Sequence, residues 1–398
     1  MDSKKKLKVL CLSLRTPPEP RPQAILIGKM ISEWIRQGVY PVVVTYVKDK
    51  KWGIKAPVYE IKPLKTSRFP VIREFIQSKN AKKHCQQIEK MIKENKINLI
   101  FSFSNPQYSN VLGAMLKQTT GVKFISHFSD PWYDDPYHSL SFWSRREILK
   151  QEKYIIKNSD RVIFVSERLK QLVMAKYPIG WLSKTAVVPH CYQESDYPPI
   201  TKTKTDKFVF SYLGVFYKQR TPEMFFKAIK LMLIEDPEPR NRILIKIIGG
   251  ADNYSKYQKN NLLKLVNKYS LNEVVELLPA VSYQESLRQM KLADCLLVID
   301  ADIKDSPFLP SKAVDYAGSG TPIIGITPAG SPTADFLRQL GYRTFNYSEA
   351  GPLTKYLGVL IKREVAFNVN QEFLQRFAVD ATTAKLINYF KETLDGKK

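Results

Sequence analysis

Short apolar runs alternate with longer amphipathic segments along the whole chain. Apolar runs flanked by polar or turn-forming residues predict buried strands, and apolar residues spaced three and four apart predict the helices between them. This alternation is typical of parallel α/β sheets. In the first half of the chain the predicted strands are Lys8–Ser13, Val42–Tyr46, Leu99–Ser102, Lys123–His127, Val162–Val165 and Ala186–Pro189. The helices predicted among them include Ala24–Gln37, Ala81–Lys93 and Ser141–Lys157.

A polar segment, Tyr192–Lys207, interrupts the alternation and predicts an interdomain linker, because it is rich in Pro, Thr and Lys and lacks apolar periodicity. The strands predicted beyond it are Phe208–Gly214, Ile243–Gly249, Val275–Leu278, Cys295–Ile299, Pro322–Ile326 and a short one at Arg343–Asn346. The helices predicted there are Pro222–Leu233, Gln258–Tyr269, Gln284–Leu292, Ser311–Tyr316 and the tail Gln371–Leu394.

We therefore expect an α/β protein of two doubly wound, Rossmann-like domains that face a cleft. The N-terminal domain is expected over residues 1–195 and the C-terminal domain over residues 208–370. The helix within residues 371–398 is expected to pack back toward the N-terminal domain. Ligands bind such folds at the carboxyl ends of the strands, so candidate chemistry is sought there.

The length of 398 residues fits two domains, and a hydrophobic content of 44% is enough for two cores. No apolar run approaches the roughly 18 residues of a membrane span, and the first residues lack the long apolar core of a signal peptide. The cysteines show no metal-binding spacing, which predicts free thiols in a reducing compartment and no zinc site. They are Cys11, Cys85, Cys191 and Cys295.

The net charge of +24 is the most distinctive bulk property, and residues 1–200 carry +17 of it. It indicates either an ordinary lysine-rich surface or attraction to an anionic partner, such as a membrane leaflet or nucleic acid. Residues Lys62–Lys96 mix lysines with apolar residues, a pattern better suited to an anionic membrane surface. No basic motif interleaved with aromatic residues is present, so nucleic acid is not expected. We expect a cytoplasmic protein, or one held peripherally on the inner face of the cell membrane.

The loop after the first predicted strand has no GxGxxG, which argues against an ordinary Rossmann dehydrogenase. Arg15 and Arg21 bracket a stiff PPEP turn there. The loop is either a rigid connection with solvated arginines, or it lines the cleft with Arg21 near a phosphate.

Residues 124–137, FISHFSDPWYDDPY, place His127, Asp130 and Trp132 where a buried strand ends. His127 and Asp130 are candidates for contacting sugar hydroxyls or handling a proton of an acceptor. The alternative is a structural role. The HxxD spacing resembles a metal motif, but no third ligand is evident, so no metal is expected.

In the second half, a strand ends at Gly214 and is followed by Lys218, Arg220 and a helix that starts near Pro222. Two cations and the N–H groups of a helix start would together neutralise a diphosphate. Gly249 and Gly250 end the next strand, where glycine lets a ligand approach the backbone.

The most informative stretch is SPFLPSKAVDYAGSGTPIIG, residues 306–325. Lys312 and Asp315 lie three apart on a predicted helix and so share one face. Ser311 is expected to cap that helix, whose start is an anion site. The turn Gly318–Gly320 is expected to allow close approach of the backbone to a ligand.

Taken together, these segments resemble family 4 glycosyltransferases of the GT-B fold over nearly the whole chain, in the branch with a DPW element and an L-P-S-K-x-x-D/E-Y element. The segments that carry the resemblance are FSDPW, Gln151–Glu152 with VIFVSE, VVPHCYQ, LGVFYKQRTP and LPSKAVDYAGSGTPIIG.

The resemblance implies a nucleotide-sugar donor held mostly by the C-terminal domain. Arg220 and Lys312 match the residues that meet the diphosphate, with Lys218 as a neighbour, and Asp315 matches the acid that grips the ribose. It also implies an acceptor near the loops after Arg15 and His127. Such enzymes usually need no metal or other cofactor and retain the anomeric configuration, with the leaving diphosphate as the base.

The chain departs from the family pattern in the donor segment. Many members carry two glutamates eight apart; here Pro307 stands at the first position and the shorter Asp315 at the second. His190 and Cys191 replace a usual asparagine-glycine pair. These departures leave a catalytically degenerate partner subunit as one alternative.

We thus expect transfer of a hexose or related sugar from a nucleoside diphosphate to a saccharide or lipid-linked acceptor, in cell-surface polysaccharide or glycolipid synthesis. Fold alone does not assign this activity, because GT-B folds also serve sugar-nucleotide epimerases and phosphorylases with a pyridoxal cofactor.

Overall fold

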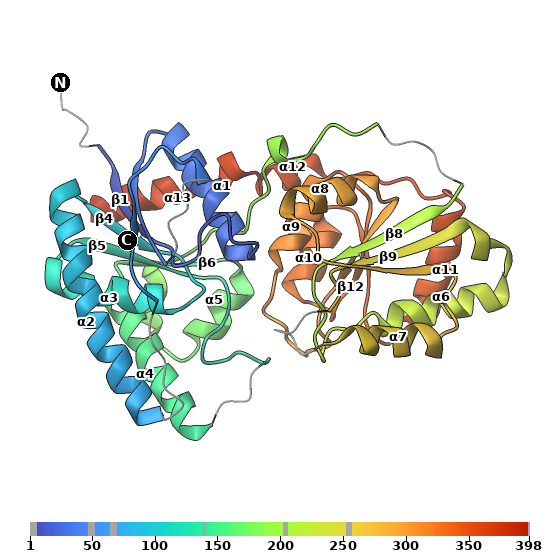
Figure 1. The fold of residues 1–398 in the computed structure, drawn as a ribbon, viewed down its shortest axis with the longest axis horizontal. Helices are drawn as coiled ribbons and strands as arrows, with labels where there is room; N and C mark the ends of the chain where they lie inside the picture. Colours follow the sequence, from blue (N-terminus) through green and yellow to red (C-terminus); the bar gives the residue numbers. More distant parts are fainter. Residues whose placement is uncertain are drawn as a thin grey trace. The chain divides into compact units, whose positions relative to one another are not determined.

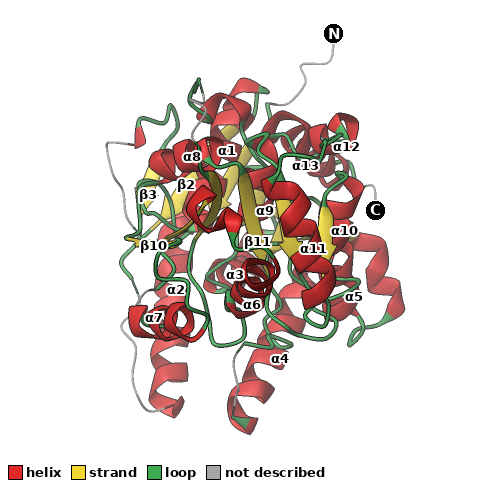
Figure 2. Ribbon diagram, turned by 90° about the vertical axis from the view of Figure 1, so that its right-hand side faces the viewer, coloured by secondary structure: helices red, strands yellow, loops and turns green. Residues whose placement is uncertain are grey.

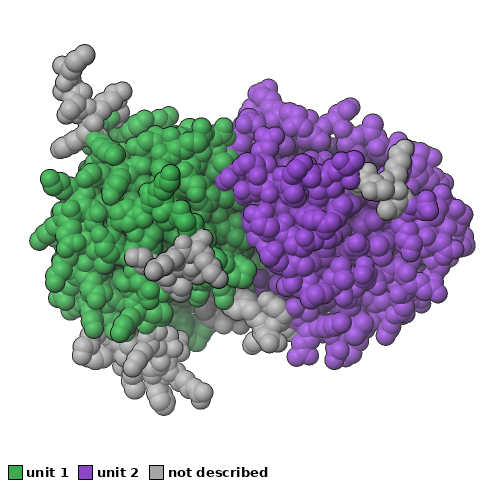
Figure 3. Space-filling model, turned by 45° about the horizontal axis from the view of Figure 1, so that its top comes forward, with its two compact units in different colours: residues 1–190, 379–398 green, residues 191–378 purple. Residues whose placement is uncertain are grey.

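The computed structural model describes residues 6–46, 52–63, 70–137, 141–201, 206–251 and 257–396, with the backbone alone for 70–79. The chain forms two compact units, coloured separately in Figure 3. Unit 1 comprises Met1–His190 and Val379–Lys398, and unit 2 comprises Cys191–Ala378. Each unit is built around one parallel sheet with helices on both sides of it (Figure 2).

Unit 1 contains a seven-stranded sheet in the order β3-β2-β1-β4-β5-β6-β7. Its strands are β1 (Lys8–Leu12), β2 (Tyr40–Thr45), β3 (Val58–Glu60), β4 (Leu99–Ser102), β5 (Lys123–Phe128), β6 (Arg161–Phe164) and β7 (Thr185–Val187). Its helices are α1 (Pro22–Arg36), α2 (Pro70–Asn95), α3 (Tyr108–Thr120), α4 (Phe142–Asn158), α5 (Glu167–Met174) and α13 (Val379–Leu394).

Unit 2 contains a six-stranded sheet in the order β10-β9-β8-β11-β12-β13 (Figure 1). Its strands are β8 (Phe208–Leu213), β9 (Ile243–Ile248), β10 (Val275–Leu278), β11 (Cys295–Ile299), β12 (Ile323–Ile326) and β13 (Arg343–Phe345). Its helices are α6 (Glu223–Glu235), α7 (Lys259–Lys268), α8 (Tyr283–Leu292), α9 (Ser311–Gly318), α10 (Pro332–Gln339), α11 (Ala350–Ile361) and α12 (Gln371–Gln375).

The central strands are mostly apolar because helices cover both faces of each sheet. Every residue of β4 and of β11 is buried. The largest core of unit 2 gathers Phe210, Phe225 and Phe226 on one side of its sheet. All neighbouring strands are parallel, so their carboxyl ends meet at one edge of each sheet.

The chain crosses between the units earlier than the predicted linker suggests. The boundary lies between His190 and Cys191, not near residue 195, because Tyr192 belongs to unit 2. Its N–H donates to the carbonyl of Phe377 at 3.0 Å, and it forms a bridge with Ala378. The two crossing segments of the chain are thus paired with each other.

The tail is two helices rather than the single helix Gln371–Leu394. Helix α12 belongs to unit 2 and α13 to unit 1, with the turn Arg376–Ala378 between them. Helix α13 packs against α1, where Phe390 lies edge-on to Trp34 at 5.3 Å between ring centroids. The C-terminal residues are therefore an integral part of the core of unit 1.

Two global features bear on function. Across the described ranges, no helix has the length and apolar character that crossing a bilayer requires. All four cysteines are described by the structure, are buried and form no disulfide, and burial raises the pKa of the Cys11 and Cys85 thiols well above their ordinary value. They therefore stay as thiols that pack in the interior.

Candidate functional site

The carboxyl ends of β8 and β11 converge with the start of α9 in unit 2. Gly214 follows β8 with a φ of 121°, which only glycine adopts readily. A Cβ atom at Gly214 would lie 3.5 Å from Nζ of Lys312. Gly214 thus lets the head of Lys312 lie directly against the end of the central strand.

Lys312 has an ammonium group without a hydrogen-bond acceptor. Its Nζ is buried, makes no hydrogen bond to the described residues, and lies 3.9 Å from the ring centroid of Tyr212. Burial, and then the charge of Arg220, lower the pKa of Lys312 well below its usual range. A buried polar group of this kind is costly unless something satisfies it, so the position favours an anionic ligand.

Arg220 provides the second cation. It closes a tight turn with Tyr217, formed by two backbone hydrogen bonds of 3.1 and 3.0 Å. Its guanidinium lies over the Tyr217 ring at 4.6 Å, and Nη2 donates to the carbonyl of Val215 at 2.8 Å. These contacts fix the guanidinium, which is well suited to hold phosphate oxygens. Lys218 is exposed at the tip of the same turn, and its role near the diphosphate stays a prediction.

Asp300 is a charged residue of this site that the sequence analysis missed. It directly follows β11 and is 2% exposed. Its Oδ2 is buried and has no hydrogen-bond partner among the described residues. Burial raises the pKa of Asp300, while Thr333, Arg220 and Lys312 oppose the rise. An acid placed directly after an entirely apolar strand was the signal that could have identified it.

Asp315 lies one helical turn after Lys312 and is buried. Its Oδ1 accepts a hydrogen bond of 3.3 Å from the hydroxyl of Tyr283, which starts α8. Its carbonyl accepts one of 2.6 Å from the hydroxyl of Tyr197. The carboxylate is therefore held in place beside the start of α8.

The predicted cap on α9 is wrong. The N-cap residue is Pro310, in an extended conformation, and Ser311 is already the first helical residue. No side chain caps the helix, so Ser311 does not compete for its first N–H groups. They remain available to a ligand at this end.

The glycines near the site mostly serve internal packing. A Cβ at Gly250 would lie 2.5 Å from Cγ2 of Ile247, and one at Gly318 would lie 2.5 Å from the ring of Tyr192. Gly249, with a φ of 72°, would meet the backbone of Ala280 at 3.2 Å. A ligand was expected to approach the backbone closely at Gly318, but the ring of Tyr192 already lies against that glycine.

In unit 1, β5 carries His127. The imidazole is 4% exposed and stacks on Phe103 at 4.4 Å between centroids, and its Nδ1 is buried without a hydrogen-bond partner among the described residues. Burial, followed by the nearby His190, lowers the pKa of His127 to about 3. His127 is therefore a neutral imidazole at physiological pH, with an open hydrogen-bonding position.

Asp130 lies three residues further along and has separate partners. Its Oδ2 accepts hydrogen bonds from Nδ2 of Asn105 at 2.6 Å and from Oγ of Ser129 at 3.0 Å. Burial raises the pKa of Asp130 and outweighs the two hydrogen bonds. Among the residues the structure describes, no three acidic, histidine or cysteine side chains cluster as a metal site would require.

Glu152, from the segment that resembles family 4, anchors the loop that contains Trp132. It is fully buried and accepts from the N–H of Tyr133 at 3.2 Å and from the hydroxyl of Tyr177 at 2.7 Å. Lys176 lies 3.4 Å from Glu152 and also pairs with Asp134. Trp132 itself is half-buried against the core of unit 1, and its role on the acceptor side stays a prediction.

The two arginines of the first loop share one partner. Oε2 of Glu19 lies 2.9 Å from Nη1 of Arg15 and 3.6 Å from Nε of Arg21. This arrangement favours a rigid connection over an open anion site. Their expected role on the acceptor side stays a prediction.

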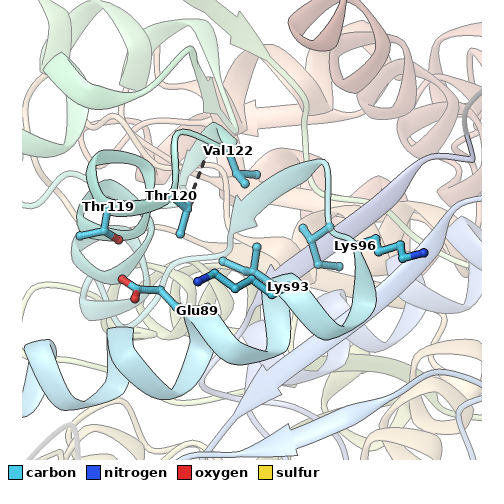
Figure 4. A pocket seen from close by; sticks show the side chains of 8 residues that line it. Glu89, Lys93, Lys96, Thr119, Thr120 and Val122 are labelled. Carbon is cyan, nitrogen blue, oxygen red and sulfur yellow. Dashed lines mark hydrogen bonds between the residues drawn. The ribbon is translucent and has the colours of Figure 1, made fainter.

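A shallow pocket between the C-terminal ends of α2 and α3 is unrelated to these groups (Figure 4). Glu89 and Lys93 line one side, and Thr119, Thr120 and Val122 line the other. Val122 directly precedes β5, so the pocket lies at the amino ends of the strands, the edge opposite to His127. We assign no function to it.

Comparison with known proteins is consistent with this geometry. Residues 24–194 match the model of the family described as Glycosyltransferase Family 4. A D-inositol 3-phosphate glycosyltransferase from Streptomyces scabiei (strain 87.22) is 26% identical over 129 residues, which are 32% of this chain and 28% of that protein. The chain spans less than half the length of the first curated relatives it matches.

Solved structures match the chain over nearly its full length. Sucrose-phosphate synthase from Thermosynechococcus elongatus superposes with a TM-score of 0.72 at 14% identity and covers 98% of this chain and 100% of its own. Anabaena HepE, solved with UDP and glucose, gives 0.70 at 13% identity, with coverages of 97% and 100%. Identities this low establish the fold alone, and they confirm the predicted GT-B fold of two Rossmann-like domains.

Proposed function

We propose that this chain is a family 4 glycosyltransferase that moves a sugar from a nucleoside diphosphate donor to a saccharide or lipid-linked acceptor, with retention of configuration. The observation that carries the proposal is the buried ammonium of Lys312, which has no hydrogen-bond acceptor among the described residues and lies near Arg220. A diphosphate supplies both the negative charge and the acceptor atoms that this position lacks. The family match and the named relatives support a glycosyltransferase, and the UDP and UDP-glucose bound by the HepE neighbour support this class of donor.

Lys312 and Arg220 would act mainly on the departing nucleoside diphosphate. Negative charge grows on the leaving phosphate as the bond to the sugar breaks, and fixed cations in a buried site stabilise that charge. The ring of Tyr212 below Nζ of Lys312 excludes water from one side of the ammonium. Asp315, oriented by Tyr283, would accept hydrogen bonds from the ribose hydroxyls.

The acceptor would bind to unit 1, near His127 and Asp130. A neutral imidazole with an open Nδ1 can hold a sugar hydroxyl through a hydrogen bond without adding charge. The carboxyl group of Asp130 can hold the acceptor hydroxyl through a hydrogen bond. With retention, an oxygen of the leaving diphosphate would take the proton of that hydroxyl as the new glycosidic bond forms, and we expect no metal or other cofactor to take part.

A transferase and an epimerase of the same fold differ in what they do without an acceptor. We expect UDP-, GDP- and ADP-sugars to remain unchanged when incubated with the protein alone. We expect nucleoside diphosphate to be released when a lipid or oligosaccharide extract is added. Conversion of the nucleotide-sugar to its epimer without an acceptor would contradict the transferase assignment. Absence of turnover with every combination of donor and acceptor would favour the alternative of a catalytically degenerate partner subunit, which Pro307 suggests.

A lipid-linked acceptor would be reached most easily by a protein attached to the membrane, and unit 1 offers a surface for this. Residues 141–146 at the start of α4, here called the α4 tip, are all exposed. Phe142 and Trp143 are 71% and 72% exposed and contact each other edge-on, and Arg145 and Arg146 follow them. In Figures 1 and 2 this end of α4 extends beyond the sheet of unit 1.

Aromatic residues beside cations suit the interface of an anionic bilayer. The basic segment Lys62–Lys96, assigned to a membrane surface from sequence, lies partly outside the described residues, at 64–69. The α4 tip is thus the membrane-facing surface that we propose for a peripheral protein on the inner face of the cell membrane.

Replacing both Phe142 and Trp143 with serine should weaken binding to vesicles that contain anionic lipid by about tenfold or more. Cosedimentation at low and high salt measures this, and salt should release the wild-type protein. The matched control is Ile234→Ser, at a residue of unit 2 that is 65% exposed. Equal binding of the double variant and the wild type would contradict the assignment of the α4 tip.

A further inference from the structure

Two hydrogen bonds fix the backbone of Asp300 at the end of β11. Its N–H donates to the carbonyl of Ile326 at 2.9 Å, and its carbonyl accepts from the hydroxyl of Tyr347. The residue is 2% exposed, and its Oδ2 is buried without a hydrogen-bond partner among the described residues.

The charges that act on Asp300 come from two other elements. Strand β11 pairs with β8, so Asp300 follows the strand next to the one that ends at Gly214, where Nζ of Lys312 lies. The N–H of Asp302 donates to the carbonyl of Gln219, the residue before Arg220, at 3.1 Å. The charges of Arg220 and Lys312 both act on Asp300. The remaining groups that interact with it are the phenols of Tyr212 and Tyr347, which are neutral at physiological pH. Asp302, two residues further on, is exposed. Asp300 is thus the acid buried with the two cations.

This group of charges contains two buried atoms that have no hydrogen-bond partner among the described residues. They are Oδ2 of Asp300 and Nζ of Lys312. In the protein alone, the carboxylate offsets part of the positive charge of Arg220 and Lys312. A nucleoside diphosphate brings at least two negative charges to the same cations. An added like charge disfavours a buried carboxylate unless it gains a proton.

We propose that Asp300 is the internal counter-ion of Lys312 and Arg220 and that it takes up a proton when the diphosphate of a nucleotide binds beside them. This inference rests on the proposed donor function and adds a positioning residue to it. The proton passes from water to Oδ2 on binding and returns to water when the diphosphate leaves. The neutral carboxyl group can then donate a hydrogen bond, where the carboxylate could only accept.

The sign of the pH effect follows directly. Protonation of Asp300 removes a negative charge that opposes the diphosphate, so nucleotide binding tightens as the pH falls. Lys312 contributes in the same direction, because a bound anion favours its protonated form. A variant that removes only the charge of Asp300 separates the two contributions to the pH dependence of binding, because the contribution of Lys312 would remain.

The test is isothermal titration of UDP, GDP and ADP into the whole protein, in two buffers of different ionisation enthalpy, between about pH 5 and 8. The wild type should take up protons on binding. Asp300→Asn should bind the same nucleotide about tenfold more tightly at the upper end of that range and take up fewer protons. Asp302→Asn, at the exposed neighbour, should match the wild type in both respects.

Equal proton uptake by Asp300→Asn and wild type, or weaker binding by the variant, would overturn the proposal. The titration of the nucleotide's own phosphate cancels in this comparison, because the ligand is the same. Should Asp300→Asn fail to fold, wild-type affinity that does not change with pH would overturn it as well. If no nucleotide binds the wild type, both the proposed donor function and this inference are contradicted. If a nucleotide binds the wild type but not Lys312→Met, the donor function stands whatever the result for Asp300.

Discussion

Replacing Lys312 with alanine should lower the rate of sugar transfer by about 10²–10³-fold or more, because one fixed donor at a developing charge contributes on this scale. The lost group is a buried ammonium, near Arg220 and held against Gly214. Without it, the leaving diphosphate would face a single cation, Arg220. Steady-state release of nucleoside diphosphate, measured with the donor and acceptor that support turnover, gives kcat and kcat/KM for each variant.

The matched variants separate charge from packing. Lys312→Met keeps most of the aliphatic stem over Tyr212 and should be as inactive as the alanine variant. Lys304→Ala removes an exposed cation from the loop between β11 and α9 and should retain the wild-type rate. Full activity in Lys312→Met would remove the basis of the donor assignment.

Replacing Phe390 with alanine should destabilise unit 1 by about 3–5 kcal/mol, the usual cost of truncating a buried phenylalanine. Phe390 is fully buried, although it lies only eight residues from the C-terminus. Its ring lies 5.3 Å from that of Trp34 and 5.4 Å from that of Phe101. All five tryptophans lie in unit 1, so tryptophan fluorescence during urea unfolding follows this unit alone.

Lys391→Ala provides the control, because Lys391 is exposed on the same helix and adjacent to Phe390. Its unfolding midpoint should stay close to that of the wild type. A small effect of Phe390→Ala would mean that α13 adds little to the core of unit 1. The tail would then be dispensable for the fold, contrary to its packing on α1.

Apolar runs predicted the strands well because parallel strands covered on both sides are mostly apolar. Leu99–Ser102, Val275–Leu278 and Cys295–Ile299 match the observed strands in full. The short edge strand β3, with the sequence VYE, was missed because it is only partly buried. The break of the tail at Arg376–Ala378 was also missed, because pairing with Tyr192, distant in sequence, sets it.

The proposed donor site could be only partly derived from the sequence. Lys312 and Arg220 were candidates because cations after a strand, or at a helix start, have a direct chemical meaning. Asp300 was overlooked, since its significance depends on burial beside two cations that are distant in sequence. The predicted cap at Ser311 was wrong because the helix starts one residue earlier than a serine cap requires.

The measurement that tests the account most directly is calorimetric unfolding of the wild type and of Lys312→Met with UDP, GDP, ADP and CMP. A nucleotide at a hundred times its dissociation constant should add about 2.7 kcal/mol to the stability of the wild type. We expect at least one nucleoside diphosphate to stabilise the wild type and to have little effect on Lys312→Met. Stabilisation by none of the nucleotides, or equal stabilisation of both proteins, would contradict a donor site built on Lys312.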